Sequence, residues 1–149
     1  MINKTLIHDR FAKKLESYNE NAKIQKRMAE ILLSYVENKS PQKILEIGCG
    51  TGFLTELVSK NLSFENFIAV DIVEDCKTYI EQISNKIIFI PQDIEEFLKE
   101  NNDTFDLIIS NASLQWLESF EDTIKTLKER LNPNGELVFS TFGNENFRE

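Results

Sequence analysis

The sequence is poor in the residues that build metal centres and disulfide frameworks, and it lacks long hydrophobic runs. Its 149 residues include one histidine and two cysteines, Cys49 and Cys76, which form neither a plausible metal cluster nor a disulfide framework. No hydrophobic run approaches the roughly 20 residues of a membrane span, and residues 1–10 are too polar for a secretory signal. These absences disfavour an integral membrane protein or a disulfide-rich secreted domain, and they favour the reducing cytoplasm.

Positive charge is also scarce, and much of it lies near the N-terminus. Lys and Arg number 17 against 25 Asp and Glu, a formal net charge of −8, which disfavours general nucleic-acid binding. Residues 1–43 carry nine basic and five acidic side chains, a net +4, whereas residues 44–149 carry eight and twenty, a net −12. A Lys-rich segment of this kind is either a solvated helical face or a surface that meets an acidic partner or the acidic body of the chain.

Length and composition predict one globular core with a helical segment before it. Hydrophobic residues make up 41% of the chain and charged residues 28%, the balance of an ordinary globular domain. We expect residues 1–40 to form an N-terminal helical arm or lid and residues 41–149 to form the core. The arm is expected to hold two helices within 5–38, with a break near 19–21. The expected apolar face of the second helix comprises Met28, Ile31, Leu32 and Tyr35.

From residue 43 onward, short apolar runs alternate with amphipathic segments. The runs are rich in Ile, Val and Phe and almost continuously apolar, which is typical of strands covered on both faces. The expected strands are 43–47, 66–71, 86–90, 105–110 and 136–142, and the expected helices are 52–62, 74–84, 94–101 and 119–131. The segment Asn132-Pro133-Asn134-Gly135 predicts a turn before the last strand. This alternation predicts an α/β fold with a mostly parallel sheet.

A glycine-rich loop follows the first expected strand. Gly48, Gly50 and Gly52 permit a sharp turn and the close approach of a ligand, just before an expected helix start whose N–H groups favour a negative group. Phe53 stands where a dinucleotide fingerprint needs its third glycine, which counts against NAD binding. The loop predicts either a ligand-binding loop at the end of this strand or only a strand-to-helix turn.

Three acidic residues lie near the same ends of the expected strands. Asp71 closes the second strand, where a carboxylate can accept hydrogen bonds from ribose hydroxyls or, alternatively, cap the helix that follows. Asp93 follows the third strand, as an acceptor for an adenine amine with Ile94 packed on the ring, or as an N-cap only. Glu46 lies within an apolar strand, which is costly unless the acid meets a donor or cation, so a role at a ligand's amino group is favoured. Together these residues predict one nucleoside pocket.

Five motifs occur in a fixed order along the chain. They are LEIGCGTG (45–52), AVD (69–71), QDIEEF (92–97), FDLIISNASLQWL (105–117) and LKERLNPNGELVFSTF (127–142). In this order they resemble the motifs of class I S-adenosylmethionine-dependent methyltransferases. Within that superfamily, RFAKKLESYNENAKIQKRMAEILL (10–33), SNASLQW (110–116) and STFG (140–143) resemble the malonyl-acyl-carrier-protein O-methyltransferases of biotin synthesis. The resemblance implies a Rossmann-like three-layer sandwich and S-adenosylmethionine as the cofactor.

The resemblance also implies roles for individual residues. The implied cofactor-binding residues are Gln25, Glu46, Gly48, Cys49, Gly50, Gly52, Asp71, Ile72, Asp93, Ile94 and Asn111. Of these, Asp71 is implied to hold the ribose, and Ile72 to pack beside the adenine. The residues implied on the methyl-transfer side are Tyr18, Asn111, Gln115 and Trp116. Tyr18 and Trp116 have structural alternatives, as a core residue and as the anchor of the following helix.

A carboxylate is the methyl acceptor that the residues favour. Its oxygen is deprotonated at pH 7, so the reaction needs in-line positioning and exclusion of water rather than a general base. This fits a chain whose one histidine, His8, has no visible catalytic or metal partner and is expected to be a surface or packing residue. We expect no metal.

The resemblance implies an acyl carrier protein bearing a malonyl group as the partner. Because such a carrier is acidic, docking is expected to use basic residues of the arm. These are Lys13, Lys14, Lys23, Lys26 and Arg27. Two alternatives stay open: a methyltransferase for another small metabolite, and a non-catalytic nucleoside-binding module that serves a partner. A dinucleotide-dependent oxidoreductase is disfavoured.

The last expected strand departs from the pattern of the family. There the sheet has seven strands, with a helical insertion and two further strands after the segment that corresponds to STFG. We expect the last two strands to be missing from this chain and strand 136–142 to be an exposed edge through which two copies could dimerise. We expect a complete cofactor half and an incomplete substrate half.

Overall fold

The computed structural model describes residues 22–111, 113–114 and 117–140. The elements in chain order are α2 (Ala22–Ser34), β1 (Lys43–Ile47), α3 (Phe53–Asn61), β2 (Asn66–Asp71), α4 (Cys76–Ile83), β3 (Ile87–Pro91), α5 (Ile94–Glu100), β4 (Phe105–Asn111), α6 (Phe120–Glu129) and β5 (Leu131–Ser140). The expected α/β fold is confirmed, and strands β1 and β2 have the predicted bounds. The other expected boundaries that fall on described residues differ mostly by one or two residues.

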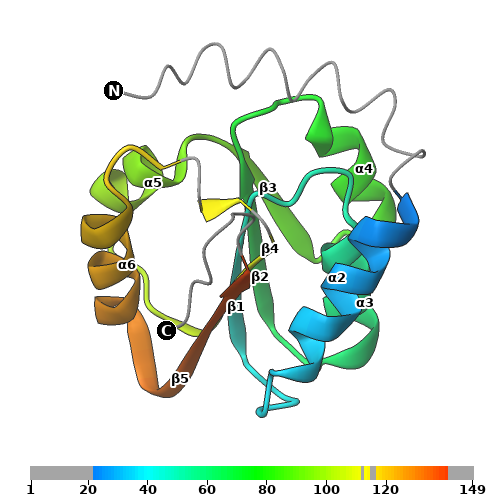
Figure 1. The fold of residues 1–149 in the computed structure, drawn as a ribbon, viewed down its shortest axis with the longest axis horizontal. Helices are drawn as coiled ribbons and strands as arrows, with labels where there is room; N and C mark the ends of the chain where they lie inside the picture. The colour runs from blue at the N-terminus through cyan, green and yellow to red at the C-terminus, as the bar shows by residue number, and fades with distance from the viewer. Residues whose placement is uncertain (1–21, 112, 115–116, 141–149) are drawn as a thin grey trace.

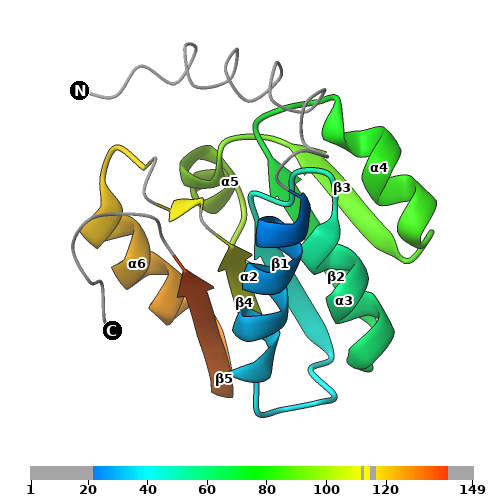
Figure 2. The same cartoon turned by 45° about the vertical axis from the view of Figure 1, so that its right-hand side comes forward.

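Five parallel strands form one sheet in the order β3-β2-β1-β4-β5. Helices α2, α3 and α4 cover one face, and α5 and α6 cover the other (Figures 1 and 2). Successive strand residues point to opposite faces, so Ile44 joins the core beneath α2, α3 and α4, while Leu45 and Ile47 join the core beneath α5 and α6. Burial on both faces explains why the strands read as continuous apolar runs.

Helix α2 presents a different face to the core from the one expected. Ala29 and Leu32 of the helix and Val36 just after it are buried, whereas Ile31 is 51% and Tyr35, at the end of the helix, 68% exposed, so the prediction was wrong for these two residues. The buried positions follow the i, i+3, i+7 spacing of a helix, but the pattern was read from large side chains and passed over Ala29 and Val36. Just beyond α2, the Glu136 carboxylate of β5 accepts hydrogen bonds from the backbone N–H groups of residues 37 and 38.

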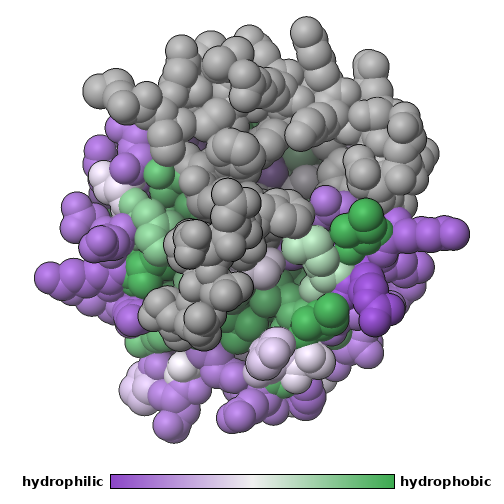
Figure 3. Space-filling model, viewed as in Figure 1, coloured by the Kyte–Doolittle hydropathy of each residue, from purple (hydrophilic) through white to green (hydrophobic). Residues whose placement is uncertain are grey.

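Strand β5 begins earlier than expected and forms an edge of the described sheet. The strand was predicted to start only after a turn at 132–135, but Leu131 already pairs with Phe105, so these residues form an irregularity within β5. Pairing then shifts, so that Leu107 faces Glu136, and Asn134 adopts a φ of 68° within this irregularity. Figure 3 shows hydrophobic surface in the lower centre of the molecule, over β5 and α2, within a hydrophilic rim. Dimerisation through this edge stays a prediction.

The described part of the chain contains no helix that is both long and apolar enough to span a membrane. The division into an arm and a core also stays a prediction, although α2, within the expected arm, packs on the core through Ala29 and Leu32.

Candidate functional site

The candidate site lies where neighbouring parallel strands end at the same edge of the sheet. Across the sheet, Asp93 follows β3, Asp71 ends β2, the glycine loop 48–52 follows β1, and Asn111 ends β4. The chain passes from β1 to β2 on one side, whereas β4 lies on the other side of β1. In open α/β sheets, ligands bind outside the carboxyl ends of strands at such a switch point. The fold therefore brings the predicted nucleoside-binding residues of three strands to one edge.

The glycine loop turns through three left-handed residues. Gly48, Gly50 and Gly52 have φ values of 72°, 56° and 96°, a conformation that is costly for residues with a Cβ. A Cβ on Gly48 would lie 2.1 Å from Oγ of Ser113, and one on Gly52 would lie 2.6 Å from Cδ1 of Ile83. Gly52 is the N-cap of α3 and supplies no side-chain cap. The loop thus requires glycine at Gly48 for space as well as for conformation, whereas at Gly52 the nearest atom is the end of the flexible Ile83 side chain and the left-handed conformation decides.

Asp71 uses its carboxylate on two backbone amides. Oδ2 accepts from the N–H of Gly50 at 2.9 Å, and Oδ1 accepts from the N–H of Val73 at 2.8 Å. The alternative in which Asp71 caps the next helix is wrong, because α4 begins at Cys76 and its N-cap is Asp75. Asp71 is therefore attached to the glycine loop rather than to the helix.

Glu46 is a buried acid with a partner inside the protein. Its side chain is 1% exposed, and Oγ1 of Thr55, on α3, donates a hydrogen bond to Oε1 at 2.5 Å. Burial raises the pKa of Glu46 from its ordinary value of 4.5 to about 8; the Thr55 hydrogen bond lowers it, and the Asp71 charge raises it. Glu46 thus meets the donor that the sequence required, and at neutral pH it is mostly protonated.

The third acid, Asp93, caps helix α5. Its Oδ1 accepts from the N–H of Glu95 at 3.2 Å, so the N-cap role is confirmed and any contact with adenine is additional to it. Ile94 is 5% exposed and packs in the core beneath α5 and α6, while Ile72 is partly buried against the opposite core. Of these two, Ile72 has more of its side chain available to a ligand.

Of the residues implied on the methyl-transfer side, the structure describes only Asn111. Oδ1 of Asn111, at the end of β4, accepts from Oγ of Ser140 on β5 at 2.8 Å, which ties the two strand ends together. Ser113, which the sequence reading did not single out, lies against Gly48; its position within SNASLQW is the signal that could have identified it. Gln25 is partly buried on α2. The predicted residues Tyr18, Gln115 and Trp116, together with His8, lie outside the described residues.

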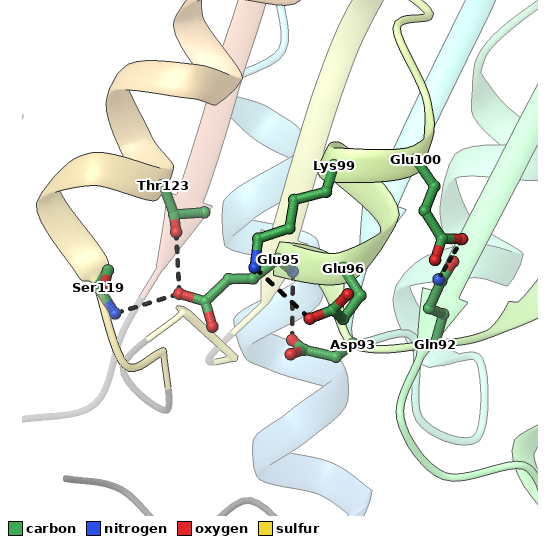
Figure 4. Close-up of polar contacts among 8 residues, drawn as sticks. All are labelled: Gln92, Asp93, Glu95, Glu96, Lys99, Glu100, Ser119 and Thr123. Atoms are coloured by element: carbon green, nitrogen blue, oxygen red, sulfur yellow. Dashed lines mark hydrogen bonds and ion pairs between the residues drawn. The ribbon is translucent and has the colours of Figure 1, made fainter.

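Glu95 connects helices α5 and α6. Its Oε2 accepts from the N–H of Ser119 at 3.1 Å and from Oγ1 of Thr123 at 3.2 Å, so α5 is joined to the start of α6 (Figure 4). The neighbouring Glu96 instead forms an exposed ion pair with Lys99 on the same helix (Figure 4). Glu95 thereby holds Ser119 and Thr123 against α5, the helix whose N-cap is Asp93.

We expect Glu95→Ala to lower the free energy of unfolding by about 1–2 kcal/mol, because the buried Thr123 hydroxyl and the exposed N–H of Ser119 lose a charged acceptor. Glu96→Ala is the matched control: it also removes a carboxylate from the first turn of α5, but only an exposed pair is lost, at about 0.5 kcal/mol or less. Urea denaturation of both variants measures the difference. Equal losses would show that the contacts of Glu95 contribute nothing specific.

The two cysteines are free and buried. Burial, with the nearby charges of Glu46 and Asp71, raises the pKa of Cys49 well above its ordinary value, and burial likewise raises that of Cys76. Both are therefore thiols at neutral pH, with little nucleophilic or metal-binding tendency. Among the described residues, no group of three or more His, Cys, Asp or Glu side chains could hold a metal ion.

Solved structures define the class of this fold. The chain is similar to the N-methyltransferase NodS from Bradyrhizobium japonicum, solved with S-adenosyl-L-homocysteine, with a TM-score of 0.63 and 24% identity over 79% of this chain and 60% of that one. The fold is that of the class I S-adenosylmethionine-dependent methyltransferases. The model of a family described as "Methyltransferase domain" matches residues 18–149, and the chain belongs to this family.

Curated relatives match the whole chain. Malonyl-[acyl-carrier protein] O-methyltransferase of Bacillus cereus is 39% identical over 155 residues, which cover 100% of this chain and 57% of the relative. The protein of the same name from Priestia megaterium is 41% identical over 156 residues, covering 100% of this chain and 56% of the relative. The chain thus spans a little over half the length of these relatives.

Proposed function

We propose that this chain binds S-adenosylmethionine and belongs to an enzyme that methylates the free carboxylate of a malonyl group carried by an acyl carrier protein. The main support for cofactor binding is a hydrogen bond between Asp71, at the end of β2, and the left-handed glycine loop at the switch point of the sheet. The acceptor is supported by the names of relatives that are 39–41% identical over the full chain. Methyl transfer of this kind is a step of biotin synthesis, as the resemblance implies, and we place it in the cytoplasm.

The residues present fit this cofactor. The left-handed glycine loop presents no side chains at residues 48, 50 and 52, and Asp71 and Asp93 are carboxylates at the ends of adjacent strands. In the proposed complex, Asp71 accepts from the ribose hydroxyls with the lone pairs not used on backbone amides, and Asp93 accepts from the adenine amine. Glu46 lies beneath the loop, close to the end proposed for the methionine part. The chemistry that the bound cofactor supplies is an electrophilic methyl group on a sulfonium.

The protein's part in the reaction is to position the acceptor and keep water away. An acceptor carboxylate is ionised at neutral pH, so no residue needs to remove a proton from it. Asn111 is held in place by Ser140 at the end of β4 and is proposed to orient the reacting groups, together with Tyr18, Gln115 and Trp116. Holding the carboxylate in line with the methyl group then provides most of the rate enhancement.

The proposed partner surface includes the outer face of α2. Lys23, Lys26 and Arg27 are exposed there, on a chain whose remaining charge is strongly acidic. An acidic carrier protein would be repelled by residues 44–149 and attracted by this helix and by the preceding Lys13 and Lys14. Binding of the carrier should therefore weaken at high salt.

The test is calorimetric titration with S-adenosylmethionine. We expect saturable binding by the wild type and at least about tenfold weaker binding by Asp71→Ala, because hydrogen bonds to a charged acceptor are lost. Asp75→Ala is the control, since Asp75 is an exposed acid four residues away with no side-chain cap bond. Transfer of a labelled methyl group to a malonyl thioester then tests the acceptor. A folded wild type that binds no cofactor would refute the proposal, and turnover only on another acid would replace its substrate.

A further inference from the structure

The end of β2 holds the glycine loop by two successive residues. The carbonyl oxygen of Val70 accepts from the N–H of Gly48 at 2.7 Å, and Oδ2 of Asp71 accepts from the N–H of Gly50 at 2.9 Å. Alternate amides of the loop are therefore bonded to neighbouring residues of one strand. The first of these bonds uses the backbone and any residue could form it, whereas the second depends on the Asp71 side chain.

The other oxygen of Asp71 is directed back to its own segment. Oδ1 accepts from the N–H of Val73, two residues further on, and both residues are buried, with exposed fractions of 8% and 2%. This bond fixes the orientation of the carboxylate before any ligand is present. The carboxylate thus serves as a rigid support between the β2 end and the β1 loop.

We propose that Asp71 is a positioning residue, which sets the conformation of the glycine loop through the Gly50 amide, in addition to contacting a ligand. Gly50 has a φ of 56° and no side chain that could restrict the loop, so the side chain that orders the loop at this residue is that of its partner, Asp71. A loop that is already ordered loses less conformational entropy when a ligand binds. Removal of Asp71 therefore weakens binding even of ligands that make no contact with its carboxylate.

The first experiment needs no ligand and follows the Gly50 amide alone. Cys49-Gly50 is the only Cys-Gly pair in the sequence, so protein labelled with carbonyl-¹³C cysteine and ¹⁵N glycine gives a single amide signal in a carbonyl-selected spectrum. We expect this amide to be protected from hydrogen exchange in the wild type. In Asp71→Ala it should exchange at least about tenfold faster, because a charge-assisted hydrogen bond is lost.

Controls separate positioning from a general loss of stability. Asp75→Ala removes an acidic side chain nearby and should leave the exchange of the Gly50 amide unchanged. A purely structural role for Asp71 would speed the exchange of amides throughout the core by one common factor, whereas positioning affects the loop first. If Asp71→Ala does not fold, the wild type still decides: an unprotected Gly50 amide would overturn the proposal.

The second experiment rests on the proposed cofactor site and separates the two roles of Asp71. Wild type and Asp71→Asn are titrated with S-adenosylhomocysteine and with its analogue that lacks both ribose hydroxyls. Asparagine keeps one acceptor oxygen and so cannot serve both Gly50 and Val73. We expect a penalty of about tenfold to persist with the analogue. A penalty that vanishes would mean that Asp71 acts on the ribose only. If neither ligand binds the wild type, the cofactor proposal fails, and the exchange of the Gly50 amide decides the positioning role by itself.

Discussion

Gly48→Ala should weaken the binding of S-adenosylmethionine by more than about tenfold while the fold is retained. Two unfavourable contributions to the free energy add at this position, one from the backbone conformation and one from a steric clash. The residue has a φ of 72°, which costs an alanine about 1 kcal/mol or more, and the new methyl group would lie 2.1 Å from Oγ and 2.5 Å from Cβ of Ser113. Rotation of the serine side chain moves Oγ but not Cβ. The backbone at residue 113 or the glycine loop must therefore move, and the glycine loop is part of the proposed cofactor site.

A second substitution separates these two costs. In the double variant Gly48→Ala/Ser113→Gly, the colliding side chain is gone, and the nearest remaining atom, Cα of residue 113, is 3.9 Å away, an ordinary contact. We expect the double variant to recover part of the affinity and to retain only the conformational cost, a factor of about five to ten. Calorimetry of the wild type, both single variants and the double variant measures this. Wild-type affinity in Gly48→Ala would show that the loop conformation is irrelevant to binding.

Glu46→Gln should make the protein more stable at pH 8 to 9 and change it little at pH 4.5 and below. The pKa of Glu46 is raised from 4.5 to about 8 by burial. Between these values the unfolded chain has lost the Glu46 proton and the folded protein retains it, so wild-type stability falls as the pH rises through this range. The full cost above pH 8 is on the order of 5 kcal/mol, and a neutral glutamine avoids it.

Denaturation of both proteins at several pH values tests this prediction. The difference in unfolding free energy should grow from about pH 5 to about pH 8 and then level off. Glutamine retains an oxygen for the Thr55 hydroxyl, so packing and hydrogen bonding are matched. Parallel stability curves for wild type and Glu46→Gln would mean that Glu46 is already ionised when the pH reaches 5. Thr55→Val is a further test, because loss of the hydrogen bond that Thr55 donates should raise the pKa of Glu46 further.

Much of the fold could be predicted from local patterns in the sequence. The apolar runs at 43–47 and 66–71 became β1 and β2 unchanged, because central parallel strands are buried on both faces and tolerate few polar residues. Elements at the edge of the sheet and on the surface were harder to predict. The face of α2 was misjudged at Ile31 and Tyr35 because the pattern was taken from large side chains and the small Ala29 was passed over. Strand β5 was placed too late because a shift in strand pairing is not encoded in residue spacing.

The sequence by itself determined the class of fold, the glycine loop and the acids that belong near it, since these depend on residue types at short spacings. Only the tertiary structure decided what those acids do: Asp71 supports the Gly50 amide, and Glu46 receives the Thr55 hydroxyl and is largely protonated. It also showed that a further acid, Glu95, joins α5 to α6. The partners lie 9 to 28 residues away in the chain. They meet because parallel strands bring successive loops to one edge of the sheet, and the burial that results sets the energy of each contact.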